Sequence, residues 1–229
     1  AAAVVSDLVT IARGGASKKT VENINAILLS HLSSLEHGER LANYPNALIQ
    51  TKLNKNLHNT CCSPQHIHKI LLNLIGNSLE VVEEQGIIQI STDNCKFSHP
   101  LAADREATPE SDYVKLTISD NGPGISREDT ECIFDPFYTT KVMGKSGTGL
   151  GLSIVWNIVQ DHKGWIEVKD NNPGALFEIY LRATNQNVCP LQDLQTAESL
   201  QGNGDTILLI DDQLEQNEII EKALQKMGY

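Results

Sequence analysis

The sequence predicts an α/β protein, because apolar residues follow both the strand period and the helix period along the chain. They recur at every second position over 87–92 and 113–118, which is the spacing of half-buried strands. They recur at helical spacing over 63–85 and 150–159. With 229 residues and 40% hydrophobic content, the chain is long enough for one sizeable domain with a core.

Composition argues against several classes of protein. The formal net charge of -11 disfavours a nucleic-acid-binding surface, since phosphate contacts need clustered Lys and Arg. The five cysteines include no Cys-x-x-Cys pair, which predicts reduced thiols, and the adjacent Cys61 and Cys62 favour packing over a redox switch because neighbouring cysteines bridge only with strain. No apolar run is long enough to cross a membrane, and nothing resembles a signal peptide. We therefore expect a soluble, cytoplasmic chain, while membrane attachment of a longer parent protein stays open.

The N-terminal part is predicted to be mostly helical. An apolar stripe over 4–12 indicates a helix that glycines at 14 and 15 end. It is either the tail of a longer helix or a frayed helix that packs on the domain. A second helix is predicted over 21–41, then a strand over 47–53 and a short partner strand over 58–62.

A long helix is predicted over 63–85. Ser63 offers an N-cap hydroxyl, and Pro64 takes the first helical position, where its missing N–H costs nothing. The residues predicted to face the core are Ile67, Leu71, Leu74, Ser78 and Leu79.

Three polar residues, Asn73, Asn77 and Glu80, fall on the opposite face of this helix. Asn is a poor former of helix interiors, so two such positions carry a cost. They are either solvated or part of a binding site.

A strand over 87–92, a loop over 94–112 and a strand over 113–118 are predicted to form an elaborated hairpin. The second strand runs into the turn 119–125, which contains Asp120. A carboxylate therefore lies where a strand ends.

The C-terminal half of the predicted domain returns to the sheet. Ser126 is expected to cap a short helix through Ile133, and a glycine-rich turn over 147–151 opens onto the next helix. Strands over 165–169 and 175–181 follow.

The carboxylate and the glycine-rich turn together indicate a nucleotide site. A helix N-terminus with free N–H groups binds anions, so the turn at 147–151 can hold phosphates while Asp120 offers a fixed acceptor. Alone, each feature is equally typical of an ordinary tight turn or helix start.

The order of these motifs, with Ile133 to Lys141 between them and the Asn-bearing helix upstream, decides between these interpretations. The chain resembles the ATP-binding catalytic domain of a sensor histidine kinase of the GHKL superfamily, with its N, G1, F and G2 boxes in sequence. The resemblance implies a two-layer α/β sandwich of the Bergerat type, with a mixed sheet and helices on one face. It assigns residues 15–185 to this domain.

The same resemblance implies the site residues. Asp120 would select adenine. Asn77 would supply an oxygen ligand to the Mg²⁺ ion that bridges the phosphates, Asn73 would assist it, and both amides are assigned to catalysis. The other cofactor-binding residues that it implies are Glu80, Gly122, Gly124, Ile125, Tyr138, Lys141, Gly147, Thr148, Gly149, Leu150, Gly151 and Leu152.

The segment from Ile133 to Gly147 would be a mobile lid over the phosphates. Lys141 and Lys145 are either phosphate contacts or solvated side chains. The run 143–146 ends like a P-loop, but Thr139 stands where that motif needs glycine, so we reject a P-loop.

Two positions depart from relatives. ATPases and serine kinases of the superfamily have Glu where this chain has Asn73, and an amide cannot accept a proton, which favours a histidine kinase over an ATPase. Ala175 stands where the family usually has Thr, so a hydroxyl near the adenine end is missing.

The ends of the chain resemble neighbouring modules of hybrid kinases. Residues 1–14 would be the end of the dimerising hairpin helix, and 186–204 a linker. The run 205–212, which ends in two acids, and the amphipathic helix after it resemble the truncated start of a receiver domain; a simple βα appendage is the alternative. We expect this piece to be disordered, docked on the domain or paired with another chain.

The implied function is to bind Mg-ATP and transfer the γ-phosphoryl to a histidine of the dimerising hairpin, in a homodimeric two-component kinase that serves a receiver domain or response regulator. None of the seven histidines is followed by an acidic residue, so the acceptor histidine is absent from this sequence. The alternatives are a GHKL-type ATPase and a nucleotide-binding regulatory module without transfer.

Overall fold

The computed structural model describes residues 17–82, 86–97, 111–140, 148–171, 173–188 and, near the C-terminus, 206–209, 220–222, 224–225 and 227–229. Two compact units form, Ala1–Val188 and Cys189–Tyr229. The seven strands and five helices that carry labels below all belong to the first unit.

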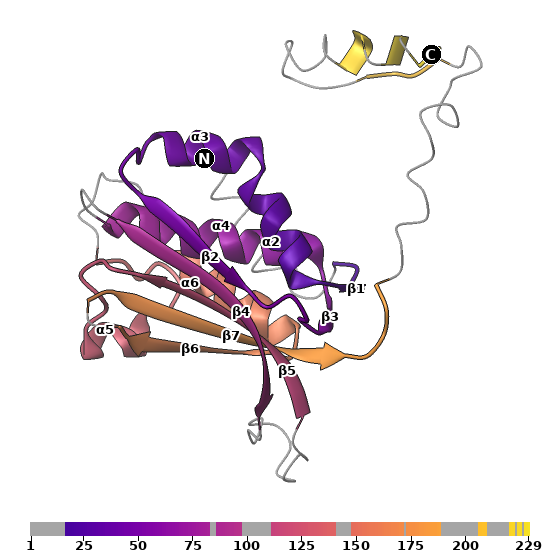
Figure 1. Ribbon diagram of the computed structural model, residues 1–229. Helices are drawn as coiled ribbons and strands as arrows, with labels where there is room; N and C mark the ends of the chain where they lie inside the picture. The colour runs from indigo at the N-terminus through magenta and orange to yellow at the C-terminus, as the bar shows by residue number, and fades with distance from the viewer. Residues whose placement is uncertain are drawn as a thin grey trace. The chain divides into compact units, whose positions relative to one another are not determined.

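One mixed sheet of seven strands forms in the described part of this unit (Figure 1). Its strands are β1 Thr20–Glu22, β2 Leu48–Leu53, β3 Asn59–Cys62, β4 Ile87–Phe97, β5 Ser111–Asp120, β6 Trp165–Asp170 and β7 Ala175–Thr184. The path runs β1-β3-β7-β5-β4-β2, and β6 pairs with β7. The β2–β4 pair is parallel and the other pairs are antiparallel.

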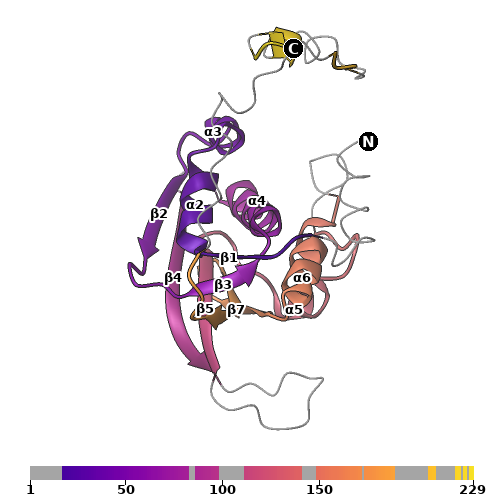
Figure 2. The ribbon, with the colours of Figure 1, turned by 90° about the vertical axis from the view of Figure 1, so that its right-hand side faces the viewer.

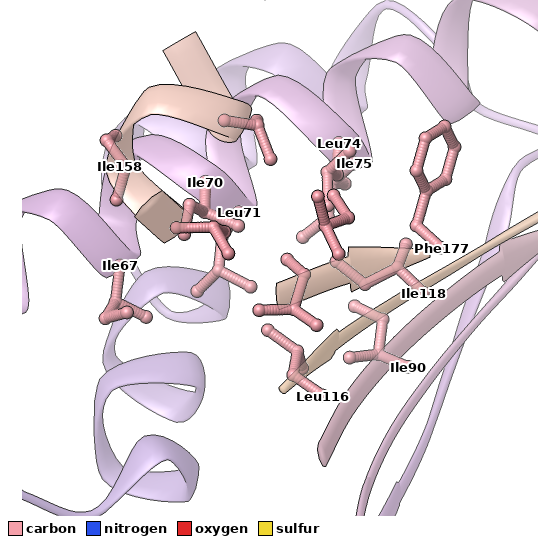
Figure 3. Packing of buried hydrophobic residues seen from close by; sticks show 14 of the residues in the cluster. Ile67, Ile70, Leu71, Leu74, Ile75, Ile90, Leu116, Ile118, Ile158 and Phe177 are labelled. Atoms are coloured by element: carbon pink, nitrogen blue, oxygen red, sulfur yellow. The ribbon is translucent and has the colours of Figure 1, made fainter. Parts of the chain in front are cut away.

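Helices cover one face of this sheet, as Figure 2 shows for α2, α4 and α6. The helices are α2 Ile24–Leu32, α3 Leu35–Ala42, α4 Pro64–Val81, α5 Arg127–Cys132 and α6 Gly151–Asp161. In Figure 3, apolar side chains of α4, among them Leu71 and Ile75, point toward Ile118 and Phe177 of the sheet. The predicted two-layer α/β sandwich with a mixed sheet is confirmed.

The long helix starts as predicted. The Ser63 hydroxyl accepts a hydrogen bond from the backbone N–H of His66 at 3.3 Å, and Pro64 occupies the first turn. The helix ends at Val81, before the predicted end at about 85, because Val82 is already extended, and residues 83–85 lie outside the described part of the chain. All five residues predicted to face the core are buried.

The single helix predicted over 21–41 is wrong. A short strand, Thr20–Glu22, comes first, and two helices follow it. Asn23 caps the first helix by accepting from the N–H of Asn25, and Ser34 caps the second by accepting from the N–H of His37. The Asn23 cap fixes the start of α2, and the Ser34 cap, which lies between the helices, divides the apolar pattern in two.

The hairpin of β4 and β5 extends further than predicted. Positions 94–97, which were assigned to a loop, continue β4, and Phe97 pairs with Ser111. The polar residues Asp93 and Asn94 hid this extension, because they interrupt the apolar alternation. Asp93 is exposed, and the Asn94 side chain bonds the backbone of Asn56 and His58.

The strand predicted over 58–62 forms, but not beside β2. It is β3, and it pairs with β1 and β7. Along it Cys61 is exposed and Cys62 is buried, because successive side chains of a strand point to opposite faces. Burial raises the pKa of Cys62 to about 12. A redox switch between the two is therefore disfavoured, and the packing interpretation holds for Cys62.

Three imidazoles meet where α2, α3 and α4 pack. The Nδ1 atoms of His31 and His68 lie 3.4 Å apart, and the rings of His31 and His37 lie 5.3 Å apart between centroids. Burial lowers the pKa of His31 to about 4, and charges on His37, His68 and Arg40 act in the same direction. The folded protein therefore keeps His31 neutral.

The free energy of unfolding should fall as the pH drops from 6.5 to about 4. The pKa of His31 is near 6.5 in the unfolded chain and about 4 in the folded chain. Neutral His31 therefore leaves the stability of the fold intact above pH 6.5. Between pH 6.5 and 4 the unfolded chain binds the proton more tightly, which lowers the free energy of unfolding by at most about 3 kcal/mol. Urea unfolding at pH 7 and pH 5 measures this loss. In a His31→Gln variant the loss should shrink by about 2 kcal/mol, and an equal loss in both proteins would contradict the assignment.

The second unit is described only in short stretches. Residues 206–209 are not in a strand, so that part of the strand predicted over 205–212 does not form. Residues 220–222 and 224–225 are helical, as the predicted amphipathic helix requires. The segments 1–14 and 189–204 and the two acids at 211 and 212 lie outside the described residues. Among those described, no helix is long and apolar enough to span a membrane.

Candidate functional site

A cavity of about 490 Å³ opens between α4, the end of β5, α5 and the start of α6. Most of the residues that the sequence assigned to a site line it. These are Asn73, Asn77, Glu80, Asp120, Gly124, Ile125, Tyr138, Thr148, Gly149, Gly151 and Leu152. Four motifs that are far apart in the sequence therefore surround one space.

Asp120 is the last residue of β5, and it is only 5% exposed. The Ser78 hydroxyl donates to its Oδ2 at 3.0 Å. The backbone N–H groups of Gly122 and Ala175 donate to its Oδ1 at 3.0 and 3.2 Å. A carboxylate has about four acceptor sites, so these three donors fix its orientation and leave capacity for a ligand.

The turn between β6 and β7 holds Asp120 from behind. The side-chain amide of Asn171 donates to the Asp120 carbonyl at 3.2 Å. Gly174 has φ +103°, and a Cβ there would lie 1.8 Å from the same carbonyl oxygen. This close approach requires glycine.

The two amides of α4 face the cavity one helical turn apart. The Nδ2 of Asn73 donates to the Lys69 carbonyl at 2.8 Å, which leaves its oxygen toward α6. A Cβ at Gly151 would come within 2.8 Å of that oxygen, so the helices approach closely there. Asn77 is half-buried and lines the cavity. Such amide oxygens are ligands that Mg²⁺ accepts.

The N-terminus of α6 is open toward the cavity. The first-turn N–H groups of Gly151 and Leu152 have no carbonyl partner within the helix. The N-cap residue, Leu150, makes no side-chain capping bond that could replace one. Gly149 has φ +68°, and a Cβ there would lie 2.5 Å from the Phe137 carbonyl carbon. Free N–H groups at a helix start favour an anion.

Tyr138 and Asp129 close the side of the cavity that α5 forms. The Tyr138 hydroxyl donates to Asp129 Oδ1 at 2.5 Å. This bond raises the pKa of Tyr138 to about 12 and lowers that of Asp129. The chain after α5 is thereby tied to that helix.

Sequence reasoning missed several lining residues. Asp129, Thr139, Thr140 and Phe177 contact the cavity, and so does Arg40, which comes from α3. Asp129 lies three residues after the Ser126 cap, and this position in the sequence does not predict a hydrogen bond to Tyr138.

Four assigned residues are not among those that line the cavity. Gly122 lies behind it and supports Asp120, and Leu150 is fully buried in the core. Lys141 and Gly147 lie outside the described residues, as does Lys145.

A second cluster, His66, Asp161 and His162, has the proximity of a metal site, but both ring nitrogens of His162 are already bonded to the backbone. His162 Nδ1 lies 2.7 Å from the Ile158 carbonyl and must donate to it, while its Nε2 accepts from the Ser63 N–H. The Lys19 ammonium lies 3.0 Å from Asp161 Oδ2. The cluster therefore joins the chain near Lys19 to α4 and α6.

The family follows from comparison with known sequences. The model of the histidine kinase-, DNA gyrase B- and HSP90-like ATPase family matches residues 62–185, which is more than half of the chain. The chain belongs to this family. The matched region begins at the end of β3 and includes β4 to β7, α4 and α6.

Similar curated proteins of this family are sensor kinases. The sensor kinase CckA of Brucella abortus is 34% identical over 170 residues, which cover 70% of this chain and 18% of CckA. The sensor histidine kinase ZraS of Salmonella typhimurium is 31% identical over 179 residues, or 78% of this chain and 34% of ZraS. The chain thus spans about a third or less of these relatives.

Solved histidine kinase domains share the fold. The catalytic domain of histidine kinase ThkA is 27% identical with a TM-score of 0.56, over 72% of this chain and 96% of that domain. The Acinetobacter baumannii histidine kinase AdeS matches with a TM-score of 0.59 at 23% identity, over 80% of this chain and 79% of AdeS. These matches agree with a sensor-kinase ATPase domain.

Proposed function

We propose that this chain binds Mg-ATP and delivers its γ-phosphoryl to a histidine on a dimerising hairpin of the same parent protein. The observation that carries the proposal is the buried Asp120 carboxylate, fixed by three donors at one end of a cavity whose other end has an open helix N-terminus. This combination fits a ligand with a hydrogen-bond donor at one end and an anion at the other.

The adenine end follows from the chemistry of Asp120. An ionised carboxylate only accepts hydrogen bonds, so it matches the exocyclic amine of adenine and repels the carbonyl oxygen of guanine. Phe177 and Ile125 line the cavity as apolar surface for the ring. Ala175 contributes its N–H to Asp120 but no hydroxyl, which we expect to weaken affinity without changing the choice of base.

The phosphate end follows from α4 and α6. Asn77 would ligate Mg²⁺ together with phosphate and water, and the α6 N-terminus would hold phosphate oxygens. Asn73 cannot act as a general base, so water is poorly activated. A neutral imidazole is already a nucleophile, and phosphoryl transfer to it depends mainly on positioning and electrostatics.

The remaining parts of the proposal concern the parent protein. Residues 1–14 would continue from the hairpin, 15–185 form the catalytic domain, 186–204 a linker and 205–229 the start of a receiver domain. A homodimer, a receiver or response-regulator partner and a cytoplasmic location complete it. Titration calorimetry with a non-hydrolysable ATP analogue, with and without Mg²⁺, tests the core of the proposal.

Replacing Asn77 by Ala should remove the magnesium dependence of nucleotide binding. Losing a supporting group near a metal commonly costs 10- to 100-fold in metal affinity, and losing a direct ligand should cost at least about tenfold. The same calorimetric titration measures it. Asn157→Ala is a matched control, because Asn157 lies on α6 and donates to the Ser153 carbonyl instead of lining the cavity. A normal response of Asn77→Ala to Mg²⁺ would refute the ligand assignment.

A further inference from the structure

The Arg40 side chain crosses from α3 onto α4. Its Nη1 donates to the Leu72 carbonyl at 3.0 Å. The guanidinium lies against Gly76, where a Cβ would come within 2.5 Å of Nη1 and 2.8 Å of Cζ. The missing side chain at Gly76 therefore makes room for Arg40, which reaches the lining of the nucleotide cavity.

The charge of Arg40 is unusual at this position. Among the described residues that line the cavity it is the one cation, whereas Glu80, Asp120 and Asp129 are acidic. The ion pairs of the described chain do not include Arg40, and its one hydrogen bond to Leu72 uses one of five donors. A half-buried guanidinium with spare donors at a cavity is suited to an anionic ligand.

The position of Arg40 along α4 identifies the part of the ligand that it faces. Ser78 bonds Asp120 near the C-terminal end of α4, which marks the adenine end. Leu72 and Gly76, which Arg40 contacts, belong to the turns that carry Asn73 and Asn77, beside the start of α6. Arg40 is therefore beside the phosphate end.

We propose that Arg40 binds the phosphates of the nucleotide from α3. The proposal rests on the proposed ATP site and adds a phosphate contact that neither glycine motif nor the two amides supply. A planar guanidinium can donate two parallel hydrogen bonds to phosphate oxygens. Among the described residues that line the cavity, α4 contributes the acidic Glu80 and no cation, so the positive charge comes from a different helix.

Titration of the purified chain with a non-hydrolysable ATP analogue in Mg²⁺, and separately with adenosine, tests the contact. Arg40→Met keeps the aliphatic stem and removes the charge. We expect ATP-analogue affinity to fall at least about tenfold, the effect of one charged hydrogen bond, with adenosine affinity unchanged within about twofold. The ATP-analogue affinity of Arg40→Lys should lie between those of the wild type and Arg40→Met, because lysine keeps the positive charge but cannot donate two parallel hydrogen bonds. Arg182→Met, at an exposed position of β7, is the matched control and should bind as the wild type does.

The outcomes separate this inference from the proposed function. If the wild type binds the analogue and Arg40→Met binds it equally well, the phosphate contact is wrong and the ATP site stands. If Arg40→Met weakens adenosine and the analogue by the same factor, Arg40 only supports the packing of α3 on α4, and the inference also fails. If the wild type binds neither ligand, the proposed function itself fails.

Discussion

Asp120→Ala is expected to weaken binding of an ATP analogue by about 10- to 150-fold, the range for one charge-assisted hydrogen bond of 1.5–3 kcal/mol. The reason is the fixed carboxylate, which Ser78 and the N–H groups of Gly122 and Ala175 hold in a buried position. Calorimetry measures the loss. Affinity unchanged within about twofold would show that the adenine binds elsewhere.

Two further variants make this test specific. Asp120→Asn keeps the shape but adds an amide donor that can meet a guanine carbonyl, so the preference for ATP over GTP should narrow. Asp161→Asn is the control for removing a largely buried acid, since Asp161 pairs with Lys19 away from the cavity lining. We expect it to lower the midpoint of thermal unfolding and to leave nucleotide affinity unchanged.

Local signals were enough to predict the parts of the site that depend on neighbouring residues. A strand end followed by a glycine turn located Asp120, and a hydroxyl followed by proline located the start of α4. The spacing of Asn73 and Asn77 placed both amides on one face of a helix, the family resemblance assigned that face to the site, and both line the cavity. Each of these features is determined within one helix or one turn, where sequence pattern and geometry are closely linked.

Contacts between elements could not be predicted in this way. Arg40 reaches the cavity only because α3 packs on α4 opposite Gly76, and Asp129 matters only because Tyr138 approaches it. The division of the predicted helix 21–41 did have a local signal at Ser34, but the apolar periodicity on both sides of it outweighed that signal. Tertiary packing thus supplied what periodicity alone could not.

The chain should be nearly silent as a kinase when it is incubated alone with Mg-ATP. No histidine here is followed by an acidic residue. His31 is buried beside two imidazoles, and both nitrogens of His162 are bonded to the backbone. Phosphoryl transfer depends on a correctly held acceptor, and Asn73 cannot activate water in its place.

Adding a separately produced hairpin from the same parent protein should restore transfer. Incubation with γ-labelled ATP, followed by detection of acid-labile phosphate on each polypeptide, measures it. We expect label on the hairpin alone, abolished by replacing its acceptor histidine and reduced by Asp120→Ala in this chain. Acid-labile label on this chain without the hairpin would overturn the acceptor argument. Rapid release of free phosphate without the hairpin would instead favour an ATPase, because the missing base at Asn73 would then be supplied by another residue.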